Sequence, residues 1–274
     1  MESRSVRVNG IQMRWEEAGS GQPVVLIHGI PTCPGLWRHV VPQLQDARTL
    51  AWEMVGYGGS IPEGRGRDIS VRQQAEYLVA WLRTIGVERA VLVGHDLGGG
   101  VAQIAAVRHP DLVQGLVLMN TIAYDSWPIP SVKLMRALGP VVRGLPDVIF
   151  RQVFRLFLLQ GHTRRQQARD AFAAHWPHYA AHGGADAFIR QVRALDVHDT
   201  LAIADQLSGL DIPAQLVWGA ADQFQPIGYG YRLAHDLRAR LDRIEGGKHF
   251  VPEDHPGRVA AAVNSLVGAV PAPR

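Results

Sequence analysis

The feature that most constrains the fold is the alternation of short, mostly apolar runs with longer amphipathic segments. Two early runs flank Asn9-Gly10, a dipeptide typical of a hairpin turn, so the sheet is expected to open with antiparallel strands. The later runs are typical of parallel strands that helices cover on both faces. The predicted strands are 4–8, 11–16, 24–27, 49–52, 90–93, 116–119, 214–217 and 241–244. The sequence therefore predicts an α/β protein with a mostly parallel, eight-stranded sheet.

Helical periodicity fills most of the intervals between these runs. It is clearest from Val71 to Ile85, where apolar residues recur on one helix face. Between Met119 and Ala214 the alternation stops and is replaced by basic amphipathic patterns such as 146–159. We interpret residues 124–210 as a helical insertion between two strands, with residues 1–123 and 211–274 forming the core.

Composition narrows the class of protein further. The chain has 274 residues, of which 47% are hydrophobic and 19% charged, values typical of a globular protein. Its net charge of +3 and lack of a long run of like charges argue against a nucleic-acid partner. One cysteine, Cys33, excludes an internal disulfide, and neither a signal-like start nor a long uncharged apolar stretch is present. We expect a cytoplasmic protein with no membrane partner, either a monomer or a homodimer.

Residues that could take part in catalysis follow four of the predicted strands. They are His28-Gly29-Ile30-Pro31, Gly94-His95-Asp96-Leu97-Gly98, Trp218-Gly219-Ala220-Ala221-Asp222 and Glu245-Gly246-Gly247-Lys248-His249-Phe250. In open α/β sheets, sites form at the carboxyl ends of the strands. The second motif has the frame of the G-x-S-x-G elbow, which presents a nucleophile on a strained turn, but carries Asp96 in place of serine. Asp96, Asp222 and His249 then follow the chain order nucleophile, acid, base.

With these motifs the sequence resembles the α/β-hydrolase superfamily, in its branch with an aspartate nucleophile. That branch includes epoxide hydrolases and haloalkane dehalogenases. The resemblance covers nearly the whole chain and rests on the ordered set of motifs, which also includes Leu36-Trp37-Arg38, Gly56-Tyr57-Gly58-Gly59-Ser60 and His249-Phe250-Val251-Pro252-Glu253-Asp254. It implies an α/β-hydrolase fold in which the insertion is a helical cap that roofs the site.

The resemblance also implies a mechanism. A carboxylate can displace a leaving group at saturated carbon, so Asp96 would form an alkyl ester with the substrate. His249 would then activate a water to hydrolyse the ester, while Asp222 orients the imidazole. The backbone N–H groups of Ile30 and Leu97 would form the oxyanion hole. No metal and no cofactor are required.

Simpler interpretations of the same residues compete with this one. Asp96 could cap the following helix, and His249 could be a packed core residue. Asp125 is an alternative to Asp222 as the acid. His175, His178 and His182 could suit a metal, but Pro177 interrupts their segment and no H-E-x-x-H motif is present.

The leaving group depends on residues around the nucleophile. Dehalogenases of this branch typically place tryptophan after the nucleophile and asparagine after the His-Gly pair, where this chain has Leu97 and Ile30. Trp127 or Trp176 could substitute as halide donors. Epoxide hydrolases use His-Gly-x-Pro, which is present, together with cap tyrosines that act as the ring-opening acid.

We therefore predict an epoxide hydrolase for a small apolar organic substrate, with Tyr179, or else Tyr124, as the acid. A haloalkane dehalogenase, an esterase or lactonase, and a non-catalytic binding protein remain alternatives. The residues expected to line the substrate pocket are His28, Pro31, Trp127, Trp176 and Phe250.

Overall fold

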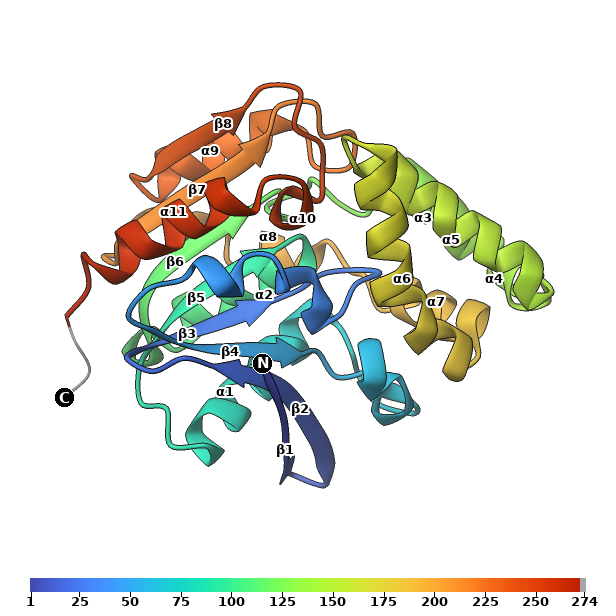
Figure 1. Ribbon diagram of the computed structural model, residues 1–274, viewed down its shortest axis with the longest axis horizontal. Helices are drawn as coiled ribbons and strands as arrows, with labels where there is room; N and C mark the ends of the chain where they lie inside the picture. The colour runs from blue at the N-terminus through green and yellow to red at the C-terminus, as the bar shows by residue number, and fades with distance from the viewer. Residues whose placement is uncertain (272–274) are drawn as a thin grey trace.

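The computed structural model describes residues 1–271 and contains the predicted eight-stranded sheet, with the strand order β1-β2-β4-β3-β5-β6-β7-β8 (Figure 1). The strands are β1 (Glu2–Val8), β2 (Ile11–Ala18), β3 (Gln22–Ile27), β4 (Ala47–Glu53), β5 (Ala90–His95), β6 (Val113–Met119), β7 (Ala214–Gly219) and β8 (Arg240–Ile244). Every predicted strand is confirmed. All eight run longer than predicted, because residues outside each apolar run continue the ladder.

Strand pairing divides the sheet into two parts. β2 pairs antiparallel with both β1 and β4, and Asn9-Gly10 forms the turn between the first two strands, both residues at positive φ. All pairs from β4 across to β8 are parallel. The carboxyl ends of the parallel strands consequently meet at one edge, where the sequence places its chemical motifs.

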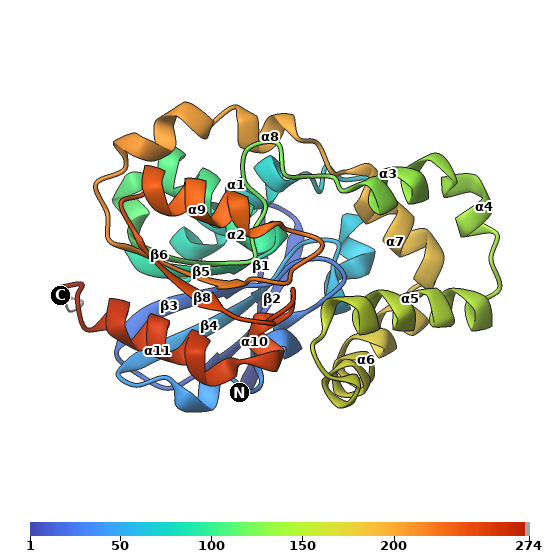
Figure 2. The same cartoon turned by 90° about the horizontal axis from the view of Figure 1, so that it is seen from above.

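Helices cover both faces of the sheet. Figure 2 shows α1 (Val71–Thr84), α2 (Leu97–Arg108) and α9 (Ile227–Asp236) on one face, and α11 (Pro256–Val267) on the other. Helix α1 confirms the clearest periodic segment. It begins where the Ser70 hydroxyl accepts the backbone N–H of Gln73, which supplies an N-cap. A short helix, α10 (Val251–Asp254), follows His249.

Six α-helices lie between β6 and β7; the first five of them form one end of the molecule in both views, and the sixth lies beside the sheet domain (Figures 1 and 2). They are α3 (Pro130–Ala137), α4 (Gly139–Arg143), α5 (Asp147–Gly161), α6 (Arg165–Ala181), α7 (Gly184–Arg193) and α8 (His198–Leu201). Pro177 lies inside α6 and does not interrupt it, contrary to the prediction. Burial of Ala171, His175 and Tyr179 on one face of α6 offsets the hydrogen bond that proline cannot make. No helix within residues 1–271 is long and apolar enough to cross a bilayer.

The turn between β5 and α2 is the tightest packing point of the fold. A Cβ atom on Gly98 would overlap the backbone carbonyls of Ile27 and His28, so α2 approaches β3 more closely than any other residue permits. This approach fixes where the elbow stands relative to the loop after β3.

We expect Gly98→Ala to destabilise the protein by about 1–3 kcal/mol or more, because the clash is with backbone and cannot be relieved by a rotamer change. Gly228→Ala is the matched control: Gly228 is an exposed residue of α9, and its new Cβ would meet no atom within 4 Å. Its helix propensity predicts a gain of up to about 1 kcal/mol. Thermal and denaturant unfolding of both variants measures the difference, and equal stabilities would show that the approach is not limiting.

Candidate active site

Asp96 stands on a strained backbone turn between β5 and α2. Its φ of 52° and ψ of −119° are unfavourable for a residue with a Cβ, and its side chain makes no capping bond to α2. The Asp96 carboxylate is therefore turned toward the carboxyl edge of the sheet. One oxygen, Oδ2, accepts the backbone N–H of Ile30 at 2.9 Å. The backbone N–H of Leu97 acts on the same carboxylate and lowers its pKa, as the Ile30 N–H does.

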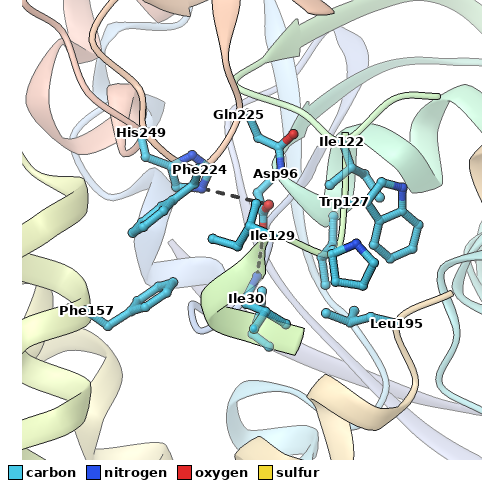
Figure 3. A pocket seen from close by; sticks show the side chains of 13 residues that line it. Ile30, Asp96, Ile122, Trp127, Ile129, Phe157, Leu195, Phe224, Gln225 and His249 are labelled. Atoms are coloured by element: carbon cyan, nitrogen blue, oxygen red, sulfur yellow. Dashed lines mark hydrogen bonds and ion pairs between the residues drawn. The ribbon is translucent and has the colours of Figure 1, made fainter. Parts of the chain in front are cut away.

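His249 lies between two carboxylates. Its Nδ1 lies 2.9 Å from Oδ2 of Asp222. Its Nε2 lies 3.8 Å from Oδ1 of Asp96, a contact that Figure 3 shows. The first contact is a hydrogen bond, and the second is too long for one. All three side chains are nearly inaccessible to solvent. The geometry suits an imidazole that Asp222 orients and whose other nitrogen faces the Asp96 carboxylate.

Asp222 is held by more than His249. Its Oδ1 accepts the backbone N–H of Phe224 at 2.7 Å, and its Oδ2 accepts an N–H of the Asn120 amide at 2.6 Å. The alternative acid, Asp125, is exposed and bonds Tyr229. The structure thus brings Asp222, and not Asp125, to His249.

Asn120 is a site residue that the sequence analysis missed. It follows β6 at a φ of 41°, and its Oδ1 accepts the backbone N–H of Gly219, so its amide ties β6 to β7 as well as holding Asp222. A polar residue that directly follows a buried apolar strand is the signal that could have identified it.

His28 supports the loop after β3, which carries Ile30, and does not line the pocket. Its Nδ1 donates to the carbonyl of Gly29 at 2.9 Å, and its Nε2 accepts the N–H of Met54 at 3.2 Å. Burial lowers the pKa of His28 to about 3, so the ring is neutral and can make both bonds at once. The loop that presents the Ile30 N–H is fixed in this way.

Burial and neighbouring charges shift the pKa values of Asp96 and His249. Burial raises the pKa of Asp96 to about 6, although His249 and the N–H groups of Ile30 and Leu97 act in the opposite direction. Burial lowers the pKa of His249, but the charge and hydrogen bond of Asp222, with the charge of Asp96, outweigh it and raise the pKa above its usual value. The two groups therefore titrate as a coupled pair.

The pocket above Asp96 is almost entirely apolar. Besides Asp96 and His249 it is lined by Ile30, Leu97, Ile122, Trp127, Pro128, Ile129, Val132, Phe157, Leu195, Phe224 and Gln225. Trp127 is thus a lining residue as predicted. Its indole N–H donates to the Thr200 hydroxyl at 2.7 Å, however, and is already engaged.

Three other predicted lining residues lie outside this pocket, and one lies beside it. His28 is behind the loop after β3, Trp176 stacks on Phe172 within the helical insertion, and Phe250 stacks on His162. Pro31 lines a small adjoining cavity that shares Phe157 with the pocket. Aromatic side chains of this insertion pack mainly on one another.

Neither of the predicted acid tyrosines reaches the pocket. The Tyr124 hydroxyl donates to Asp236 at 2.6 Å, and the Arg232 guanidinium covers its ring at 3.7 Å. The Tyr179 hydroxyl donates to Gln191 at 2.7 Å inside the helical insertion. Both hydroxyls donate to partners that do not line the pocket, so the structure does not bring either one into it.

Gln225 is the second site residue that the sequence analysis missed. It follows the Asp222 loop, is 3% exposed, and lies beside Asp96 with its amide over the pocket (Figure 3). Within residues 1–271, its Oε1 has no hydrogen-bond partner. An unpaired buried amide oxygen is costly unless it serves a ligand. Of the residues that the structure describes, Gln225 is also the one amide side chain that lines the pocket.

The fold defines a hydrolase, and the candidate nucleophile Asp96 stands on a turn at the carboxyl edge of its sheet. The alpha/beta hydrolase fold family matches residues 22–256, and the chain belongs to that family.

Haloalkane dehalogenase 2 of Mycobacterium bovis is 29% identical to this chain over 277 residues, covering 94% of this chain and 92% of that protein. Epoxide hydrolase A of Mycobacterium tuberculosis is 36% identical over 138 residues, covering 49% and 43%. An alpha/beta hydrolase fold protein from Burkholderia ambifaria, known from its crystal structure, superposes with a TM-score of 0.87 at 25% identity and covers 96% and 97%. The resemblance to the branch with dehalogenases and epoxide hydrolases is thereby confirmed.

We expect Asp222→Asn to reduce turnover by about 10³–10⁴-fold, because the amide cannot hold the imidazole in the required tautomer and charge state. Asp125→Asn should leave turnover unchanged, because Asp125 is exposed and bonds Tyr229. Steady-state rates of the two variants decide between the acids. Comparable losses in both, or a loss confined to Asp125→Asn, would contradict the assignment.

Proposed function

We propose that this hydrolase displaces a leaving group from a saturated carbon of a small apolar substrate through a covalent alkyl ester of Asp96. The observation that carries the proposal is that the two oxygens of the Asp96 carboxylate have different surroundings. The backbone N–H of Ile30 holds Oδ2, while Oδ1 faces His249 across 3.8 Å, and the residue borders an apolar pocket. A carboxylate in this position attacks carbon, whereas a serine would be needed to attack an ester carbonyl efficiently.

In the first step, Oδ1 forms a bond to the substrate carbon and the leaving group departs with the bonding electron pair. In the second, a water attacks Cγ of the ester and His249 takes its proton. The carbonyl oxygen of the ester becomes an oxyanion on Oδ2, which the N–H groups of Ile30 and Leu97 stabilise. The Cγ–Oδ1 bond then breaks, the alcohol leaves with the proton that His249 took from water, and the acid that remains at Asp96 loses its proton to neutral His249 and then to solvent, which restores the carboxylate.

Alkylation also prepares the second step. The charge of Asp96 is one of the causes that raise the pKa of His249. Esterification removes that charge, so the pKa of His249 falls and the neutral imidazole needed as a base is favoured.

For the leaving group, we propose a halide in place of the predicted epoxide oxygen. An opening epoxide leaves an alkoxide that must be protonated, and neither Tyr124 nor Tyr179 is available for that. The Gln225 amide can donate a hydrogen bond but cannot release a proton, which suits an anion that is stable once expelled. The alignment with haloalkane dehalogenase 2 spans nearly the whole chain and supports this choice.

The experiment that tests the proposal is the intact mass of a His249→Gln variant after incubation with panels of haloalkanes, epoxides and esters. Without the base the alkyl ester should persist, so a haloalkane should add its alkyl group without halogen, and peptide mapping should place it on Asp96. Addition of a whole epoxide mass would restore the original prediction, and no adduct with any substrate that wild type consumes would refute the ester. His39→Gln, which changes an exposed histidine, is the matched control and should not accumulate adduct.

We expect Gln225→Leu to lower kcat/KM for haloalkanes by about 10²-fold, the usual effect of losing one donor to a developing charge. The loss should be larger for a chloroalkane than for the corresponding iodoalkane, because chloride is the poorer leaving group and needs the donor more. Gln223→Leu, which replaces a neighbouring exposed glutamine, is the control. An equal loss with both halides would indicate a structural effect only.

We expect kcat/KM to fall as the pH drops below about 6. The reason is that alkylation needs ionised Asp96, whose pKa burial raises to about 6. The pH profile of kcat/KM reports groups of the free enzyme and is therefore the appropriate measurement. A limb near the ordinary aspartate value of about 3.9 would contradict the assignment.

A further inference from the structure

The outer surface of the helical insertion is unusually apolar. Ten large hydrophobic residues are exposed among residues 1–271, and seven of them lie between residues 134 and 159. These seven are Leu134, Leu138, Val141, Val148, Ile149, Leu156 and Leu159, and we refer to them as the outer cap face. They belong to α3, α4 and α5 or to the turn between the first two, at the end of the molecule away from the sheet (Figures 1 and 2). Such a concentration of apolar surface marks an interaction site.

Helix α5 is apolar on both of its sides. Phe150, Phe154 and Leu158 are buried against the rest of the insertion. At 100° per residue, Val148, Leu156 and Leu159 fall within one arc on the opposite side, where all three are exposed. Arginines 151 and 155 flank this arc and are also exposed. The exposed side of α5 is thus an amphipathic surface made of aliphatic side chains bordered by positive charge.

Positive charge is concentrated in the same region. Residues 130–170 contain eight lysines and arginines but only two acidic residues, whereas the rest of the chain has twenty basic and twenty-three acidic residues. A hollow of about 330 Å³ between α5 and α6 brings Arg155, Arg165 and Arg169 together with Leu156 and Leu159. The net charge of +3 is therefore unevenly distributed, because residues 130–170 carry an excess of positive charge and the rest of the chain carries a small excess of negative charge.

We propose that the outer cap face docks on the surface of a membrane that contains anionic lipids. Aliphatic side chains on an exposed helix can enter the boundary between headgroups and acyl chains, and arginines beside them pair with anionic headgroups. A second copy of the chain fits less well, because a symmetric contact would place the same positive charges opposite each other. The sequence analysis expected no membrane partner for want of a spanning segment, and docking on a surface needs none.

Docking would bring the lipid close to the substrate pocket. Val132 of α3 and Phe157 of α5 line that pocket from the inner sides of two helices whose outer sides carry the exposed face. An apolar substrate that partitions into lipid would thus be concentrated next to its site. Membrane docking itself does not depend on the chemistry of Asp96, and it is measured without substrate.

The test is co-sedimentation of the whole protein with lipid vesicles. We expect binding to vesicles of equal parts phosphatidylcholine and phosphatidylglycerol, little binding to phosphatidylcholine alone, and weaker binding as salt is added. Inorganic phosphate should not compete beyond the effect of its ionic strength. Equal binding to both vesicles, or binding to neither, would overturn the proposal.

Paired variants separate the outer cap face from general surface effects. Leu156→Asp with Leu159→Asp, and separately Arg165→Glu with Arg169→Glu, should each weaken partitioning by about tenfold or more. Leu201→Asp and Arg83→Glu change an exposed leucine and an exposed arginine outside this face and should bind as wild type does. Circular dichroism confirms that each variant is folded. If light scattering instead shows a dimer that dissociates only in the two double variants, the outer cap face binds a second copy of the chain, and the proposal is wrong.

Discussion

The bend of the backbone at Asp96 depends on how closely three segments approach one another. Gly98 brings α2 against the end of β3, and a Cβ on Gly29 would overlap the Asp96 carboxylate itself. Between these two glycines the carboxylate meets the Ile30 N–H, and the ring of His28 holds the loop that carries it. A φ of 52° at a residue with a side chain persists only where the surrounding packing imposes it. The position of the Asp96 carboxylate therefore depends on the close packing at this edge of the sheet.

A second buried cluster connects the helical insertion to the segment that follows His249. Glu253 of α10, four residues after His249, meets Nε2 of His162 at 2.9 Å and Nε2 of His175 at 3.3 Å, and Arg38 contacts it from the loop after β3. Burial acts to raise the pKa of Glu253, but the two histidines outweigh it and hold this pKa well below its usual range. The insertion and the His249 loop are therefore joined by charge as well as by apolar packing. The same buried cluster thus holds both the helical insertion that covers the pocket and the segment that follows His249.

The strands and the catalytic candidates could be predicted because each depends on local pattern. Asp96, Asp222 and His249 follow strand ends, and parallel strands bring their ends together whatever covers them. The positions of Tyr179 and Tyr124 could not be predicted, because each hydroxyl bonds a partner distant in sequence, Gln191 and Asp236, which only the packing of the helices reveals. Gln225 was missed for the same reason: nothing in Phe224-Gln225-Pro226 indicates that its amide turns toward Asp96.

The most direct test of the account is a single turnover in water enriched in ¹⁸O, with enzyme in excess over a substrate that it hydrolyses. If Asp96 is the nucleophile, the product oxygen comes from its carboxylate. The first alcohol should then carry ¹⁶O, and the peptide that contains Asp96 should gain the heavy isotope. If the first product carries ¹⁸O and this peptide is unlabelled, water attacks the substrate directly and the alkyl ester does not form.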